Sequence, residues 1–258
     1  FRPMGNDNKS NKSGDNYVYI AIRRSHKPPE SATDVFALDT GGLTSPSPPQ
    51  FTSNFPVDML LQKPSISGGN NWKVRTRLLG LTKLTTNDVD EGEDDGNGYQ
   101  DFGLDRNNGY ENSNSVNADD LVYMFKRAPG FFDAIAYEGT GSNYTSINHG
   151  LTVIPEMFWI KRVNAGNSWA IYHKDCGAGF SLTFDDNDKN PGDVWQDTGV
   201  PTSTQFFTHN RATTNASGGD YVGYFFATLP GISKVGQYLS LIHISEPTRL
   251  GMLSYAVF

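Results

Sequence analysis

Short apolar runs, separated by Pro, Gly and Asn, make up most of the chain. Residues 72–78 alternate strictly, with Trp, Val, Thr and Leu on one face and Lys and Arg on the other. Such alternation is typical of a strand with one solvated face. Residues 17–22, 121–125 and 221–226 are instead apolar on both faces, as strands in the middle of a sheet or sandwich are. No amphipathic helix of three turns or more is evident, so the pattern predicts an all-β fold.

The apolar pattern repeats along the chain. The stretch at 119–137 consists of an apolar strand, a break at Ala128-Pro129-Gly130 and a second apolar strand, and versions of it begin at Asn16 and Asp220. Matching positions lie about 100 residues apart, which is the size of a single domain rather than the period of a solenoid. The sequence therefore predicts tandem antiparallel β-sandwich modules of about 100 residues, without substantial helix.

The breaks at Pro29, Pro129 and Pro230 set the expected module boundaries. Residues 1–30 are then the C-terminal part of a truncated module, and residues 31–128 form the first complete module. Residues 131–230 form the second complete module, and residues 231–238 are the first strand of a missing module. The chain begins inside a repeat, so we expect it to be a fragment of a longer protein.

Composition narrows the classes of function. The net charge of −7 is poorly suited to a phosphate backbone, so we expect no nucleic-acid partner. A single cysteine, Cys176, excludes an internal disulfide framework and a cysteine-rich zinc site. No apolar run approaches the roughly 20 residues that span a bilayer, so we expect no membrane insertion. The low hydrophobic content of 36% and the 27 glycines suit short strands joined by many turns.

Several sequence units are similar to those of a known family. They include Phe-Pro-Val-Asp at 55–58, Met-Phe-Lys-Arg-Ala-Pro-Gly-Phe-Phe-Asp at 124–133 and Gly-Leu-Thr-Val-Ile-Pro-Glu-Met at 150–157. With residues 169–173 and 221–226, they resemble a tandem module of uncharacterised tail-fibre and virion-surface proteins of marine bacteriophages. The resemblance covers roughly residues 13–238. It implies a virion location, extracellular when the protein acts, and supplies no catalytic or binding residues.

Residues 239–258 are set apart from the fold prediction. They resemble a translated sequencing adapter, and the repeat pattern stops abruptly after Tyr238. The alternative is a native, divergent C-terminal strand. We exclude the segment from the prediction as an artefact.

Two Gly-rich acidic loops occupy matching places in the two complete modules, at 88–98 and 185–193. Carboxylate oxygens are the ligands that calcium prefers, and the second loop supplies the candidates Asp185, Asp186, Asp188 and Asp193. The spacing does not follow the EF-hand pattern. We therefore favour solvated acidic turns and expect no resident metal or other cofactor.

The four tryptophans, Trp72, Trp159, Trp169 and Trp195, raise the question of a sugar-binding face. Trp72 and Trp169 fall on the apolar face of alternating strands, so we expect both in the core. Trp195 lies beside the second acidic loop and is our candidate for an exposed aromatic contact with a ligand.

The histidines and the cysteine give no convincing catalytic group. His173, Asp175 and Cys176 are close in sequence, but the position that matches His173 in the first module is Thr76, which disfavours a nucleophilic site. His149 and His209 have no partners at ligand spacing, so we expect both at the surface.

These observations lead to three hypotheses of function. The first is a non-enzymatic structural or adhesion segment of a phage tail fibre or virion-surface protein, whose loops contact the host. The second is a lectin-like carbohydrate-binding module. The third is a polysaccharide depolymerase, which needs two carboxylates at glycosidase separation. The expected partners are a host-surface glycan or protein and other virion proteins, and we allow for a homotrimer.

Overall fold

The computed structural model describes residues 27–40, 49–94, 103–111, 119–186, 189–192, 194–195 and 199–237. Every strand pairing in these ranges is antiparallel, and their only helical element is the short 3-10 turn η1 (Ala32–Asp34). The predicted all-β fold is therefore confirmed. No helix in this part of the chain is long and apolar enough to cross a membrane. The strand expected at 17–22 and the segment 239–258 lie outside the described residues.

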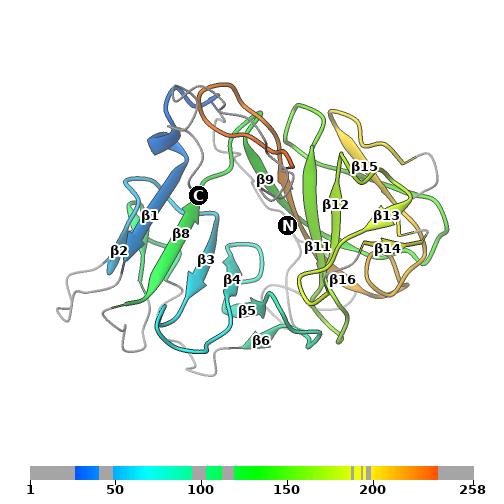
Figure 1. The fold of residues 1–258 in the computed structure, drawn as a ribbon, viewed down its shortest axis with the longest axis horizontal. Coiled ribbons are helices and arrows are strands. Elements are labelled where there is room, and N and C mark those ends of the chain that lie inside the picture. Colours follow the sequence, from blue (N-terminus) through cyan, green and yellow to red (C-terminus); the bar gives the residue numbers. More distant parts are fainter. Residues whose placement is uncertain are drawn as a thin grey trace, which may run out of the picture.

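Two large sheets lie next to each other (Figure 1). The six-stranded sheet has the order β1 (Phe36–Thr40), β8 (Leu121–Phe125), β3 (Met59–Lys63), β4 (Lys73–Thr76), β5 (Thr82–Thr85), β6 (Glu93–Asp94). The four-stranded sheet has the order β12 (Ala170–His173), β11 (Met157–Arg162), β16 (Asp220–Phe226), β9 (Phe132–Glu138). We call the residues from β1 to β8 the first unit and those from β9 to β16 the second unit.

Both units have the same strand order. In the first, β1 pairs with β8, β8 with β3 and β3 with β4. In the second, β9 pairs with β16, β16 with β11 and β11 with β12. The repeat in the sequence thus corresponds to a repeat in sheet topology, whereas the module boundaries drawn from the sequence stay a prediction.

Smaller sheets complete each unit. They are β2 (Phe51–Thr52) with β7 (Gly109–Tyr110) in the first unit, and β10 (Thr145–Asn148) with β15 (Gln205–Thr208) and β13 (Phe180–Ser181) with β14 (Asn190–Pro191) in the second. Phe51 and Tyr110 pack with Leu60 and Met124 in one core cluster, and Phe206 packs with Phe158 in another. Each unit therefore has its own sandwich-like core.

A third core joins the two units. It contains Met59 and Leu84 of the first unit together with Trp169 and Tyr224 of the second, all at most 1% exposed. The large sheets therefore pack face to face, and each has apolar side chains on both sides. This arrangement explains why β16 is almost entirely buried and why its sequence is apolar on both faces.

The shared core brings equivalent positions of the two units together. Phe125 ends β8 and Phe226 ends β16, and their rings contact each other with centroids 6.2 Å apart. Trp169 stacks on Tyr224 at 6.3 Å, just as Trp72 stacks on Tyr123 at 5.6 Å. The second pair is only half-buried, since the two sheets do not cover each other symmetrically.

A tight turn follows the last strand of each unit. The carbonyl of Ala128 accepts a hydrogen bond from the N–H of Phe131 at 3.2 Å, and that of Leu229 accepts one from Ile232 at 2.9 Å. Gly130 and Gly231 have φ values of 75° and 77°, which L side chains rarely adopt. Pro and Gly at the centre of both turns are therefore required by a type II geometry.

The segment after the second turn differs from expectation. We expected the first strand of a missing module at 231–238, but residues 231–237 contain one bridge, between Leu229 and Ser233, and no strand. Val235 is instead buried in the shared core. In Figure 1 this segment runs from β16 over the top of the molecule towards the first unit.

The matched tryptophans test the importance of the shared core. Trp169 is 1% exposed and its Nε1 donates to the carbonyl of Thr85 in the first unit at 2.8 Å. We expect Trp169→Phe to lower the free energy of unfolding by about 2 kcal/mol or more, through lost packing and one lost hydrogen bond. The control Trp72→Phe should cost less than about 1 kcal/mol, because Trp72 is half-buried. Equal costs in urea denaturation would contradict a shared core.

Candidate functional site

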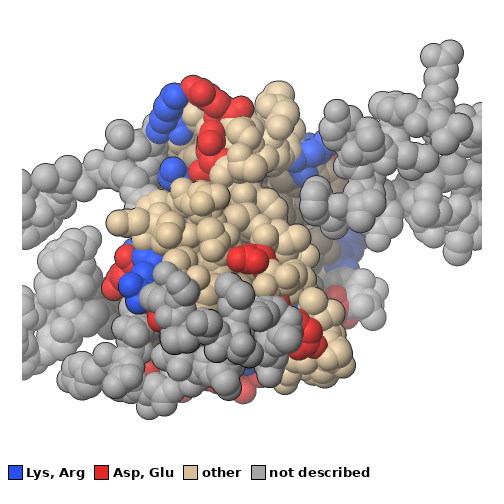
Figure 2. All heavy atoms as spheres, turned by 90° about the vertical axis from the view of Figure 1, so that its left-hand side faces the viewer, with Lys and Arg blue, Asp and Glu red and all other residues tan. Residues whose placement is uncertain are grey.

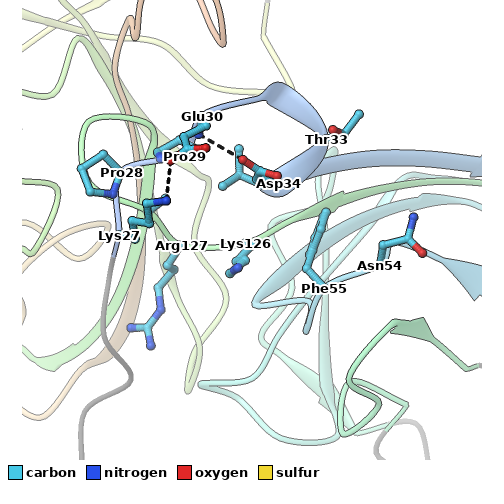
Figure 3. A pocket seen from close by; sticks show the side chains of 12 residues that line it. Lys27, Pro28, Pro29, Glu30, Thr33, Asp34, Asn54, Phe55, Lys126 and Arg127 are labelled. Carbon is cyan, nitrogen blue, oxygen red and sulfur yellow. Dashed lines mark hydrogen bonds and ion pairs between the residues drawn. The ribbon is translucent and has the colours of Figure 1, made fainter.

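A pocket of about 540 Å³ opens at the end of the first unit where β8 leaves the six-stranded sheet (Figure 3). It combines an apolar lining with three cationic and two acidic side chains. The lining residues are Lys27, Pro28, Pro29, Glu30, Thr33, Asp34, Val35, Asn54, Phe55, Lys126, Arg127 and Ala128. Figure 2 shows acidic and basic side chains gathered at the top of this side of the molecule, the level at which η1 lies in Figure 1.

One wall is the segment that precedes β1. The hydroxyl of Ser31 caps η1, and the carboxylate of Asp34 accepts the N–H groups of Ser31 at 2.9 Å and Glu30 at 3.0 Å. This reciprocal arrangement is a capping box. The same two N–H groups hold the pKa of Asp34 below its ordinary value. The turn thus keeps a carboxylate ionised at the edge of the pocket.

The opposite wall comes from the loop between β2 and β3. Asn54 has a φ of 63°, a left-handed conformation that Asn tolerates better than most residues. The hydroxyl of Ser53 donates to the carbonyl of Phe55 at 2.5 Å and so stabilises this bend. Phe55 is 3% exposed and anchors the loop in the first unit's core. The Asn54 side chain therefore stands on a firmly packed support.

The floor carries two cations that directly follow β8. Arg127 lies 3.8 Å from the carboxylate of Asp58 and 4.0 Å from that of Asp133, and its N–H donates to Asp58 at 2.8 Å. Lys126 differs, because among the described residues its ammonium group forms neither a hydrogen bond nor an ion pair. In Figure 3 it lies between Arg127 and Phe55, below η1.

The Asp58 network recurs in the second unit with other side chains. There Glu156 accepts the Nζ of Lys174 at 3.1 Å and the hydroxyl of Thr228 at 2.7 Å. The backbone agrees, since the N–H of Asp58 bonds to Phe125 at 2.8 Å and that of Glu156 to Phe226 at 2.9 Å. A carboxylate at the start of the third strand therefore ties strand ends together in both units, which is a structural role.

The acidic loops lie around the side chain of Lys161, a cation of the protein itself. Lys161 is fully buried, and its Nζ donates to the carbonyls of Val89 at 3.1 Å, Asp88 at 3.4 Å and Asn167. Burial lowers the pKa of Lys161, while the carboxylates of Asp88, Asp185 and Asp90 act in the opposite direction. The two loops thus surround an ammonium group where we considered calcium.

The calcium candidates are only partly described. Asp185 and Asp186 are exposed, and Asp185 accepts a hydrogen bond from Ser168 at 3.2 Å. Asp188 and Asp193 lie outside the described residues. No group of three or more His, Cys, Asp or Glu that could hold a metal occurs in the part of the chain that is described.

Trp195 is not an exposed contact, and that expectation was wrong. Its side chain is 0% exposed and packs edge-on against Phe158 with ring centroids 4.8 Å apart. Its Nε1 donates to the carbonyl of Phe180 at 3.1 Å. A neighbouring acidic loop suggested exposure, but the second unit's core needed a large aromatic side chain at this place.

The histidines also differ from each other. His149 is 8% exposed rather than on the surface, stacks on Phe225, and its Nε2 lies 3.0 Å from the carbonyl of Thr202. Burial lowers its pKa. His209 is half-buried against Tyr144.

The sequence neighbours of Cys176 form a turn after β12. His173 lies 3.7 Å from Asp175, and the N–H of Cys176 donates to the carbonyl of His173 at 3.0 Å. Cys176 itself is half-buried. These contacts account for the three residues as parts of one turn.

The carboxylates of the repeated network offer a matched stability test. Asp58 is 5% exposed between Arg77 and Arg127, each 3.8 Å away. We expect Asp58→Asn to cost about 1–3 kcal/mol of unfolding free energy, because the buried carboxylate that two half-buried guanidinium groups share is lost. Glu156→Gln should cost at most about 1 kcal/mol, because its partner Lys174 is 41% exposed. The reverse ranking in chemical denaturation would contradict this assignment.

The position of Lys161 leads to a prediction about calcium. Since an ammonium group already balances the acidic loops, millimolar calcium should leave the melting temperature of the protein unchanged relative to a sample with chelator. Specific binding to the folded state would raise it. A saturable rise on calcium titration would show that the loops hold a metal after all.

Comparison with known proteins gives a family for part of the chain. Residues 126–243 match the model of a domain of unknown function, DUF7483. The match begins directly after β8, takes in all strands of the second unit and extends past Tyr238. No curated protein and no solved structure matches the chain significantly. The second unit is therefore similar to this family of unknown function, which supplies no residue roles.

Proposed function

We propose that the chain is a structural and adhesion segment of a phage tail fibre or related virion-surface protein. Its units stack into a stiff support, and its loops contact the host surface. The protein is then part of the virion and extracellular when it acts. A host glycan or protein and other virion proteins are its partners, with a homotrimer as one possible assembly. The sequence resemblance supplies the virion setting, and the packing of the units supports the mechanical role.

The observation that carries the proposal is the shared core between two units of the same topology. In the second unit, Trp169 and Lys161 are buried under residues 85–89 of the first unit. An interface with a continuous apolar core and satisfied polar groups resists relative motion of domains. Two units joined in this way form one stiff body rather than two flexibly linked domains.

The first unit has a similar surface that is less covered. Lys63 donates to the carbonyl of Asn70, as Lys161 does to that of Asn167. Lys63 and Trp72 are nevertheless half-buried, where Lys161 and Trp169 are buried. Both sets lie on the faces that the two units turn towards each other, so the shared interface is more closely covered on the second unit's side.

Two other functions are ranked behind this one. A carbohydrate-binding module is favoured by the pocket with its uncompensated Lys126. A depolymerase is less well supported, because the two buried carboxylates next to the pocket, Asp58 and Asp133, both bind Arg127. We therefore propose a protein without enzymatic activity.

Adhesion and virion location can be tested together. Fluorescently labelled protein should bind saturably to a subset of strains in a panel of marine bacteria, and unlabelled protein should compete with it. The neighbours of the complete reading frame should be tail or capsid genes. Labelling no stronger than that of an unrelated β-sandwich, together with a bacterial operon around the gene, would contradict the proposal. Release of reducing ends from host polysaccharide would instead favour the depolymerase.

A further inference from the structure

The Lys126 side chain stands out against the other cations of the pocket. Lys27 pairs with Glu30, and Arg127 lies between Asp58 and Asp133. Lys126 is half-buried, and its ammonium group has no hydrogen-bond or ion-pair partner among the described residues. Partial removal of an ammonium group from water is unfavourable unless an anion or hydrogen-bond acceptor compensates it. The pocket therefore presents a cationic group that has room for an acceptor.

The nearest acidic groups compensate the positive charge of Lys126 only in part. Asp34 attracts Lys126 over some distance, but its Oδ2 already accepts two backbone N–H groups. Glu30 is engaged by Lys27. Lys27 is paired with Glu30, and Arg127 with Asp58 and Asp133, so Lys126 is the cation of the lining that has no ion pair to a described residue. A negatively charged group of a ligand would supply that partner.

A second polar side chain of the lining, Asn54, lies beyond Phe55 from Lys126 (Figure 3). The Asn54 side chain is exposed, projects from a left-handed bend and makes no hydrogen bond to described residues. An amide offers both donors and an acceptor, so it suits an oxyanion or a neighbouring hydroxyl. Pro28 and Pro29 add apolar surface nearby. An unpaired cation, an amide and apolar surface in one pocket are typical of sites for small organic ligands.

The repeat shows that these features are an addition to the common scaffold. In the second unit, Ala227 follows β16 where Lys126 follows β8, and Ala227 is 2% exposed. The tight turn at Pro129-Gly130 precedes β9, whereas the longer segment from Pro28 to Asp34 precedes β1. The scaffold does not need the lysine or the longer segment, since the second unit folds without either. Loop additions to a rigid scaffold commonly carry binding functions.

We propose that this pocket binds the anionic group of an acidic sugar, either the carboxylate of a uronic acid or a sulfate ester. Lys126 contacts the anion, Asn54 contacts an adjacent oxygen, and the apolar walls pack against the sugar ring. A volume of about 540 Å³ is large for an isolated ion and falls in the range that holds a small organic molecule. The inference deepens the proposed adhesion function by naming the ligand class.

Binding can be measured by calorimetry or by NMR titration with defined probes. These are glucuronate, glucose 6-sulfate, neutral glucose and inorganic sulfate. We expect the carboxylated or the sulfated sugar to bind, glucose to bind at least about tenfold more weakly, and salt to weaken the interaction. Whichever acidic sugar binds identifies the anion. Equal affinity for glucose, equal affinity for inorganic sulfate (an adventitious anion only) or no binding at all would overturn the proposal.

Lys126→Gln gives the decisive variant. It should weaken binding of the acidic sugar at least about tenfold while leaving the melting temperature unchanged, since the ammonium group supports no described contact. Lys174→Gln is the matched control, because Lys174 is a surface cation paired with Glu156 in the other unit, and it should bind as the wild type does. Unchanged affinity in Lys126→Gln would overturn the proposal. If the protein binds the acidic sugar but not cells, the proposed adhesion is wrong and the pocket proposal stands. If the protein binds cells and Lys126→Gln binds them equally well, adhesion stands and the pocket is not the site that carries it.

Discussion

The structure depends on the apolar contact between its two large sheets. Phe125 and Phe226 meet in this contact, and the side chain of Trp169 donates a hydrogen bond to the first unit. Burial of aromatic side chains dominates the energy of such interfaces. The contact also buries the ammonium group of Lys161 together with the carbonyl groups that accept its hydrogen bonds. Separating the two units would therefore expose these polar groups and the apolar core at the same time. This interface therefore opposes relative motion of the two units.

The pocket is a consequence of the same arrangement. Lys126 and Arg127 lie at the crossing from one unit to the next, where β8 has ended and the tight turn before β9 begins. Arg127 is bound to carboxylates of both units, Asp58 and Asp133, and fixes the path of the chain at this point. The crossing therefore holds Lys126 in the pocket, whose lining also includes Asn54 and the segment before β1. A loop site gains precision when its support is rigid.

The sequence predicted the parts that local pattern determines. The alternation at 72–78 identified the buried face of β4, because Val74 and Thr76 are buried while Lys73 and Arg75 are not. The strands apolar on both faces, at β8 and β16, indicated cores on either side of a sheet. The Pro-Gly pairs marked the two turns that require a positive φ. Side-chain period and turn chemistry are properties of neighbouring residues, so they can be read without knowing the tertiary fold.

Features that depend on distant residues were missed. Trp195 is buried by Phe158 and Phe180, which no local pattern places beside it. Lys161 has the sequence context of a strand-end lysine, and only the approach of the first unit's acidic loop buries it. Lys126 and Asn54 were not singled out, although the longer connection at Pro28-Pro29 in the first copy was a signal that something had been added there.

The central claim is that the two units form one cooperative structure. Native-state hydrogen exchange measures this most directly, because it reports the opening free energy of each strand separately. The amides of β8 and β16 should exchange through openings of the same free energy, and both should respond equally to low concentrations of denaturant. If β8 opens at a clearly lower free energy while β16 stays protected, the shared core does not couple the units and the account is wrong.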